Sequence, residues 1–106
     1  MTNGQRKQRQ ARRFACDCEA RCEILGKQSI GRITTLSATG AWIERSDPPA
    51  EGSILKLSFA AGSVDIATQA RVVDRLPGKG MGVAFQDLLP QYRKAIEALS
   101  ADATRN

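Results

Sequence analysis

The sequence predicts a mainly β fold, namely a six-stranded antiparallel β-barrel with one C-terminal α-helix. Apolar and polar residues alternate from Phe14 to Ile24, which indicates a strand with one buried face. Short runs with similar alternation recur later, separated by turns rich in glycine and proline. Near the C-terminus the apolar spacing changes to that of a helix. Short antiparallel strands with short connections favour a closed or nearly closed barrel, because closure hides the sheet edges.

The remaining elements are expected in chain order after the first strand. Further strands are expected at about 29–37, 41–44, 55–59, 64–73 and 81–85. Turns or loops are expected at 26–28, 47–52, 61–63 and 77–80. The helix is expected to open at Asp87 or Pro90, and its apolar stripe consists of Tyr92, Ala95, Ile96 and Leu99. This stripe is expected to pack on the barrel rather than on a partner, because a small domain needs every apolar face buried.

Length and composition indicate one small globular domain. The chain has 106 residues, of which 42% are apolar and 25% are charged, as is ordinary for a globular protein with one modest core. No run of about 18 apolar residues is present, so no membrane span is expected. The N-terminus has no apolar stretch of the signal-peptide type. Three cysteines, an odd number, then indicate the reducing cytoplasm.

The positive charge of the chain is concentrated at its N-terminus. Residues 1–13 hold five of the 16 basic residues and none of the 11 acidic ones, so the remainder carries 11 of each sign. We therefore expect a flexible basic arm at 1–13, a barrel with its helix at 14–100 and a frayed tail at 101–106. The arm can be read in two ways, as a solvated tail that touches nucleic acid non-specifically or as part of a defined binding site.

The cysteines are expected to fill the core. Cys16, Cys18 and Cys22 all fall on the apolar face of the first strand. A zinc site would need cysteine or histidine ligands that converge from a turn, but the chain has no histidine and no Cys-x-x-Cys pair. Free cysteine packs as a small hydrophobic residue, so no metal or redox role is expected.

Two short motifs carry the functional prediction. The first is Arg9-x-x-x-Arg13 in the arm, and the second is Thr35-x-Ser37-x-x-Gly40 at the end of a predicted strand. This pair resembles the PilZ family, whose pattern is Arg-x-x-x-Arg followed by Asp/Asn-x-Ser-x-x-Gly. The resemblance covers nearly the whole chain and implies a six-stranded barrel with a C-terminal helix that binds the bacterial messenger cyclic di-GMP. Thr35 stands where the family has Asp or Asn.

The arginines of the first motif suit a cyclic dinucleotide. The planar guanidinium binds phosphate oxygens through two parallel hydrogen bonds and keeps its charge at any physiological pH. It also matches the O6 and N7 atoms of guanine. The four-residue spacing keeps Arg9 and Arg13 on one side of the arm, and Arg12, which points elsewhere, is a secondary candidate.

The second motif offers small polar groups and a tight turn. Thr35 and Ser37 have the same strand parity and are expected on one face. Gly40 can take a turn with positive φ and lets a backbone or a ligand come close. The alternative is an ordinary polar hairpin end. A threonine offers only one hydroxyl to the guanine edge, and loss of a charge-assisted hydrogen bond costs about 1–3 kcal/mol, so binding is expected to be weakened rather than abolished. Trp42, the only tryptophan, is expected in the core, with base stacking as the alternative.

The sequence as a whole predicts a cytoplasmic cyclic di-GMP receptor with no catalytic activity and no cofactor. The chain has no histidine, no nucleophile–base pattern and no metal constellation. Ordering of the arm on the ligand is expected to alter the surface offered to an unidentified protein partner. Two alternatives stay open, namely a PilZ-like interaction module that has lost nucleotide binding through Thr35, and a small barrel that binds nucleic acid through the arm. The neutral body disfavours the second, because such barrels usually carry a basic groove with exposed aromatic residues.

Overall fold

The computed structural model describes residues 12–103, which form six strands and one helix. Their bounds are β1 (Phe14–Ile24), β2 (Lys27–Leu36), β3 (Gly40–Glu44), β4 (Ile54–Ala61), β5 (Val64–Leu76), β6 (Gly80–Gln86) and α1 (Pro90–Ala103). All strand pairs are antiparallel, and the sheet closes into a barrel in the order β1-β2-β3-β6-β5-β4. The predicted fold class is therefore confirmed.

The barrel is closed by pairing between β1 and β4. This seam is short and consists of the pairs Arg21↔Ser58, Cys22↔Leu57 and Glu23↔Lys56. By contrast, β4 and β5 form a hairpin in which every residue of β4 has a partner in β5. Within the described residues, closure gives every strand two neighbours, and β1 and β4 pair at three residues of their facing edges.

The core lies inside the barrel and is formed by inward residues of all six strands together with Ile96 of α1. Alternation is clearest in β4, where Leu55, Leu57 and Phe59 are buried and their neighbours are exposed. In β1, Cys22 is buried, and Cys16 and Cys18 are half-buried against the core. The prediction that all three cysteines contribute to the packed face of this strand is therefore confirmed.

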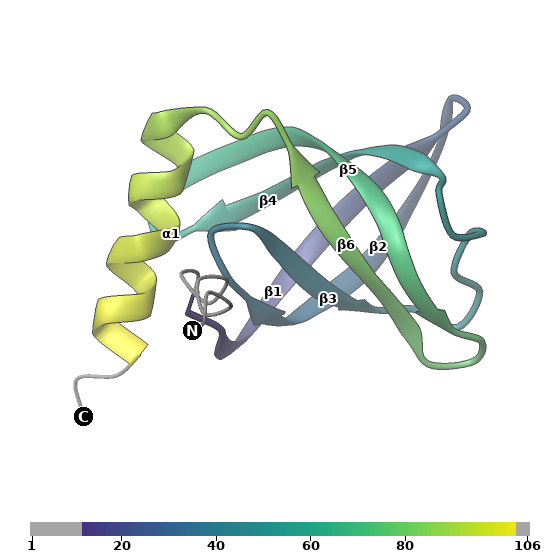
Figure 1. The fold of residues 1–106 in the computed structure, drawn as a ribbon, viewed down its shortest axis with the longest axis horizontal. Coiled ribbons are helices and arrows are strands. Elements are labelled where there is room, and N and C mark those ends of the chain that lie inside the picture. Colours follow the sequence, from purple (N-terminus) through teal and green to yellow (C-terminus); the bar gives the residue numbers. More distant parts are fainter. Residues whose placement is uncertain (1–11, 104–106) are drawn as a thin grey trace, which may run out of the picture.

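The helix α1 lies across one end of the barrel, at the end where the described chain begins (Figure 1). Ile96 is buried in the core, and Tyr92, Ala95 and Leu99 pack against it, as their spacing predicts. Pro90 is the first helical residue, a position that proline favours because its missing N–H has no partner there in any case. Within residues 12–103, no helix has the length and apolar character needed to span a bilayer.

The first hairpin is tighter than expected. Its turn consists of Leu25 and Gly26, with φ angles of 52° and 82°, and β2 begins at Lys27 rather than near Ser29. Two consecutive residues with positive φ are typical of a type I′ turn, whose twist matches that of the flanking strands. A leucine is uncommon at such a position, which explains why the sequence pattern did not indicate this turn. In Figure 1 this hairpin lies at the end of the barrel far from α1.

Candidate functional site

Two β-bulges shape the outer wall of the barrel. The β2 ladder shifts register between Ile33 and Thr35, and the β5 ladder shifts between Val72 and Asp74. A bulge inserts one extra residue and reverses the alternation of the side chains that follow. As a result, Thr35 lies on the outer wall next to the fully buried Leu36, and Asp74 is exposed on that wall.

The two bulges place four residues in one row across four strands. Thr35 pairs with Trp42, Trp42 pairs with Gly82, and Gly82 pairs with Asp74. Gly82 has no side chain, and a Cβ atom there would lie 3.5 Å from both Trp42 Cε3 and Asp74 Cβ. The indole and the carboxylate therefore flank the one position of the row that is open.

A groove of about 330 Å³ lies over this row. It is lined by the motif residues Arg13, Thr35, Ser37 and Gly40 together with Leu36, Thr39, Ala41, Trp42, Val73, Asp74, Gly82, Val83 and Ala84. The structure thus brings Arg13 of the first motif together with the residues of the second motif at one place. This groove is the candidate functional site.

The position of Trp42 differs from the prediction. The residue was expected in the core, but Ile43 takes the inward position of β3 and Trp42 lies half-buried on the outer wall. Gly82 on the adjacent strand leaves room for the indole. The strand β3 has only five residues, so its alternation is too short to show whether Trp42 faces the core or the outer wall, which explains the error. The consequence is an aromatic surface inside the groove.

Ser37 builds the turn that ends β2. Its hydroxyl accepts hydrogen bonds from the backbone N–H groups of Thr39 (3.1 Å) and Gly40 (3.2 Å), and it lies 3.4 Å from the carbonyl oxygen of Gly40. The backbone N–H of Ser37 donates to the same carbonyl at 2.9 Å. Only 4% of Ser37 is exposed. The hydroxyl therefore satisfies the turn backbone, as serine commonly does at hairpin ends.

Gly40 is required by a close approach and not by its backbone angle. The described glycines with positive φ are Gly26, Gly52, Gly62 and Gly78, so the expected positive φ at Gly40 is wrong. A Cβ atom at residue 40 would overlap the carbonyl oxygen of Val83 and would lie 3.3 Å from its carbonyl carbon. The other predicted reason for a glycine here, a close backbone approach, is confirmed.

The three candidate arginines are placed as follows. Arg9 lies outside the described residues. Arg13 is exposed and lines the groove beside the turn. Arg12, its neighbour, lines a separate hollow of about 330 Å³ between the turn and α1, together with Arg93. Arg12 and Arg13 thus line different hollows, and Thr39 lines both.

The cysteines have the properties of packed core residues. Burial, reinforced by the neighbouring Cys18 and Asp17, raises the pKa of Cys16 to about 12, and burial also raises the pKa of Cys22 above its usual value. Both thiols are therefore protonated at neutral pH, whereas the thiolate is the form that binds metals and attacks electrophiles. In the part of the chain that the structure describes, no group of three or more potential ligands could hold a metal ion.

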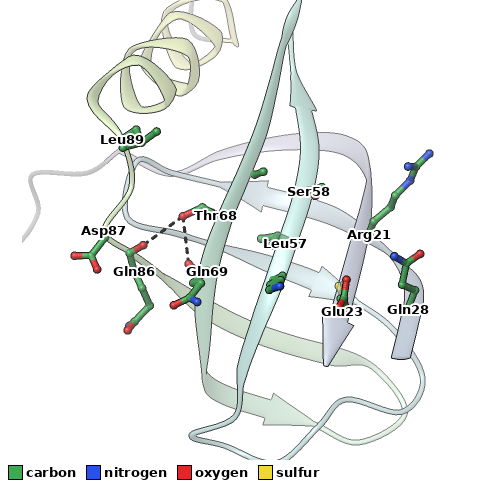
Figure 2. Close-up of a pocket in the computed structure, with 13 residues that line it drawn as sticks. Arg21, Glu23, Gln28, Leu57, Ser58, Thr68, Gln69, Gln86, Asp87 and Leu89 are labelled. Carbon is green, nitrogen blue, oxygen red and sulfur yellow. Dashed lines mark hydrogen bonds between the residues drawn. The ribbon is translucent and has the colours of Figure 1, made fainter. Parts of the chain in front are cut away.

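A larger hollow of about 560 Å³ lies on another part of the wall, over β1, β4 and β5 (Figure 2). Its charges are mixed, because Arg21 and Lys56 are accompanied by Glu23 and Asp87. Near its rim the Thr68 hydroxyl donates to the carbonyl oxygen of Gln86 at 3.3 Å. No motif residue lines it, whereas the groove is lined by Arg13 and by the residues of the second motif, so the groove is kept as the candidate site.

Several groove residues could not be found by sequence reasoning. Val73, Asp74 and Gly82 belong to strands that were predicted, but the bulge in β5 determines which side chains face outward. Arg93 was not singled out by the sequence either, and it lines the hollow between the turn and α1. A sequence pattern gives no indication of a bulge that has no glycine, so these residues were missed.

The fold and the groove place the chain among small closed β-barrels with a hollow of ligand size on the outer wall. The model of the PilZ domain family matches residues 7–102. The chain therefore belongs to the PilZ domain family, as the two motifs predicted. No curated protein sequence matches the chain.

Solved structures with the same fold include two bacterial proteins. MotI/DgrA, the inhibitor of motility from Bacillus subtilis, has a TM-score of 0.77 at 14% identity, and YcgR from Escherichia coli, in complex with c-di-GMP, has 0.76 at 13%. Each comparison covers 92% of this chain but only 52% and 46% of the other, so the chain spans about half the length of these proteins. The PilZ domain of YcgR with c-di-GMP has a TM-score of 0.72 at 14% identity, and 92% of both chains is covered.

Proposed function

We propose that this protein is a cytoplasmic receptor domain for cyclic di-GMP and that it performs no catalysis. The observation that carries the proposal is that Arg13, Trp42 and the turn at residues 37–40 line a single groove. Membership in the PilZ domain family and the cyclic di-GMP complexes of YcgR, which has the same fold, support the choice of ligand.

Each part of the groove suits a part of the ligand. The guanidinium of Arg13 can bind a phosphate through two parallel charge-assisted hydrogen bonds. The outward indole of Trp42 offers a surface for base stacking, which contributes about 1–3 kcal/mol per base. The groove volume of about 330 Å³ lies at the lower end of the roughly 300–1,000 Å³ that is usual for ligand pockets. A further segment of the chain that covers the groove would enclose the bound ligand.

The arm is the segment proposed to supply this cover. Residues 6–13 hold all the excess positive charge and contain no large apolar residue. A ligand with two phosphates would give Arg9 and Arg13 charge-assisted partners and offset the entropy of ordering the segment. Ordering would change the surface near the turn, which is where a partner protein would detect the bound state.

Amide hydrogen exchange tests this ordering. Addition of cyclic di-GMP should slow exchange in residues 6–13 and 37–40, because both segments gain hydrogen bonds to the ligand. Residues 55–59 of β4 serve as the internal control and should change little, since all of them pair with β5 and residues 56–58 also pair with β1. Exchange that slows evenly over the whole barrel would contradict ordering of the arm.

Calorimetric titration of the full chain tests ligand choice. Cyclic di-GMP should bind at physiological salt in preference to cyclic di-AMP, GMP and single-stranded DNA. If cyclic di-GMP does not bind at millimolar concentration, the receptor proposal is wrong. If DNA does not bind either, the presence of Thr35 in place of the family's Asp or Asn would favour an interaction module without ligand. If DNA binds, the result would favour the nucleic-acid alternative.

A further inference from the structure

We propose that Asp74 reads the guanine base in this protein and supplies, from β5, the carboxylate that the motif lacks at Thr35. This inference rests on the proposed function, because it concerns the same groove and the same ligand. The sequence motif does not include Asp74, which lies 39 positions beyond Thr35.

The row across the four strands carries the argument. Thr35 and Asp74 lie at its two ends, with Trp42 and Gly82 between them. A base stacked on the Trp42 indole lies roughly parallel to the ring, so its hydrogen-bonding edge points along the wall toward one end of the row. Toward Asp74 no side chain intervenes, because the residue between them is Gly82: Trp42 Cε3 and Asp74 Cβ each lie 3.5 Å from the point that a Gly82 Cβ atom would occupy.

The local backbone supports an outward carboxylate at this position. The bulge between Val72 and Asp74 places Val73 and Asp74 together on the outer wall, where regular alternation would turn Asp74 inward. Among residues 12–103, Asp74 has no recorded hydrogen bond or ion pair, whereas the exposed Asp17 is paired with Arg32. Both Asp74 oxygens are therefore available to donors on a ligand.

The chemistry of a carboxylate at this position favours guanine over adenine. Guanine presents two adjacent donors on its Watson–Crick edge, N1–H and the N2 amino group, and a carboxylate can accept from both. Adenine presents an unprotonated N1 at the corresponding place, which a carboxylate repels. The hydroxyl of Thr35 offers a single rotatable group and discriminates less.

The test is calorimetric titration of the full chain with cyclic di-GMP and with its inosine analogue, which lacks the N2 amino group. Asp74→Ala should weaken cyclic di-GMP binding about tenfold, because a charge-assisted pair of hydrogen bonds is lost. It should also remove most of the preference for cyclic di-GMP over the inosine analogue, an effect that a purely structural role would not produce. Asp65→Ala, a matched change of an exposed acid on β5 away from the groove, should leave both quantities unchanged.

A second variant shows whether position 35 can take over the same role. In the Asp74→Ala background, Thr35→Asp should restore most of the lost affinity, and it should help less in the unaltered chain, where Asp74 already accepts from guanine. If the protein binds cyclic di-GMP but Asp74→Ala changes neither affinity nor preference, the role of Asp74 is refuted and the receptor function stands. If the unaltered chain does not bind cyclic di-GMP, both proposals fail.

Discussion

Arg13→Ala is expected to weaken cyclic di-GMP binding by about tenfold to a hundredfold. Arg13 is the described motif arginine that lines the groove, and hydrogen bonds to charged groups contribute about 1.5–3 kcal/mol each. The side chain is exposed, so solvent and physiological salt screen the interaction, and we expect an effect near the lower end of this range. Calorimetric titration of the variant and the unaltered chain in the same buffer measures the effect.

Two variants show whether the effect of Arg13 depends on its shape and position or only on its charge. Arg13→Lys keeps the charge but loses the planar fork, so it should recover only part of the affinity. Arg12→Ala removes the same charge from the adjacent residue, which lines the other hollow, and should have a smaller effect. Equal losses for Arg12→Ala and Arg13→Ala would mean that only the net charge of the arm matters, which would argue against a defined phosphate site.

The sequence predicted the barrel well because its main determinants are local. Alternation in β1 and β4, the glycine turns and the helical stripe around Ile96 each depend on neighbouring residues, and together they agree on one fold. The end of β5 was placed at Val73 rather than Leu76, because the extra residue of the bulge interrupts the alternation there.

The candidate site was predicted only in part, because it depends on how strands align across the barrel. The motifs identified Arg13 and the turn residues, because each motif is a fixed spacing within a few neighbouring residues. Which faces Thr35 and Asp74 occupy depends on two bulges, and the meeting of Trp42 and Asp74 at Gly82 depends on register across two ladders. Neither property is encoded in a short window of residues.

The motif serine illustrates a second limit. The pattern Thr35-x-Ser37-x-x-Gly40 was interpreted chiefly as a ligand-binding set. In the structure, the Ser37 hydroxyl is engaged with the turn backbone, and Gly40 permits the approach of β6. A motif that defines a binding family therefore also contains residues that hold the binding wall in shape, and a sequence does not separate the two roles.

Gly40→Ala is expected to destabilise the barrel itself, by about 3 kcal/mol, as for an overpacked core position. The added methyl group would overlap the carbonyl oxygen of Val83, a backbone atom that cannot move aside as a flexible side chain can. Val83 is held in place because its side chain is buried and because it pairs with Ala41. The clash would therefore separate β3 from β6, and for a domain of this size the midpoint of thermal unfolding should fall by roughly 12–24 °C.

Gly82→Ala is the matched control, because it makes the same chemical change in the same pair of strands. Its methyl group would lie 3.5 Å from Trp42 and Asp74, an ordinary contact distance, and the φ angle of Gly82 is not positive. Its unfolding midpoint should stay within a few degrees or rise slightly, because alanine reduces the entropy of the unfolded chain. Its cyclic di-GMP affinity should fall, since the methyl group fills the open position of the groove. If instead Gly40→Ala keeps its thermal midpoint and loses only ligand affinity, the motif glycine acts through the ligand and not through the contact between β3 and β6.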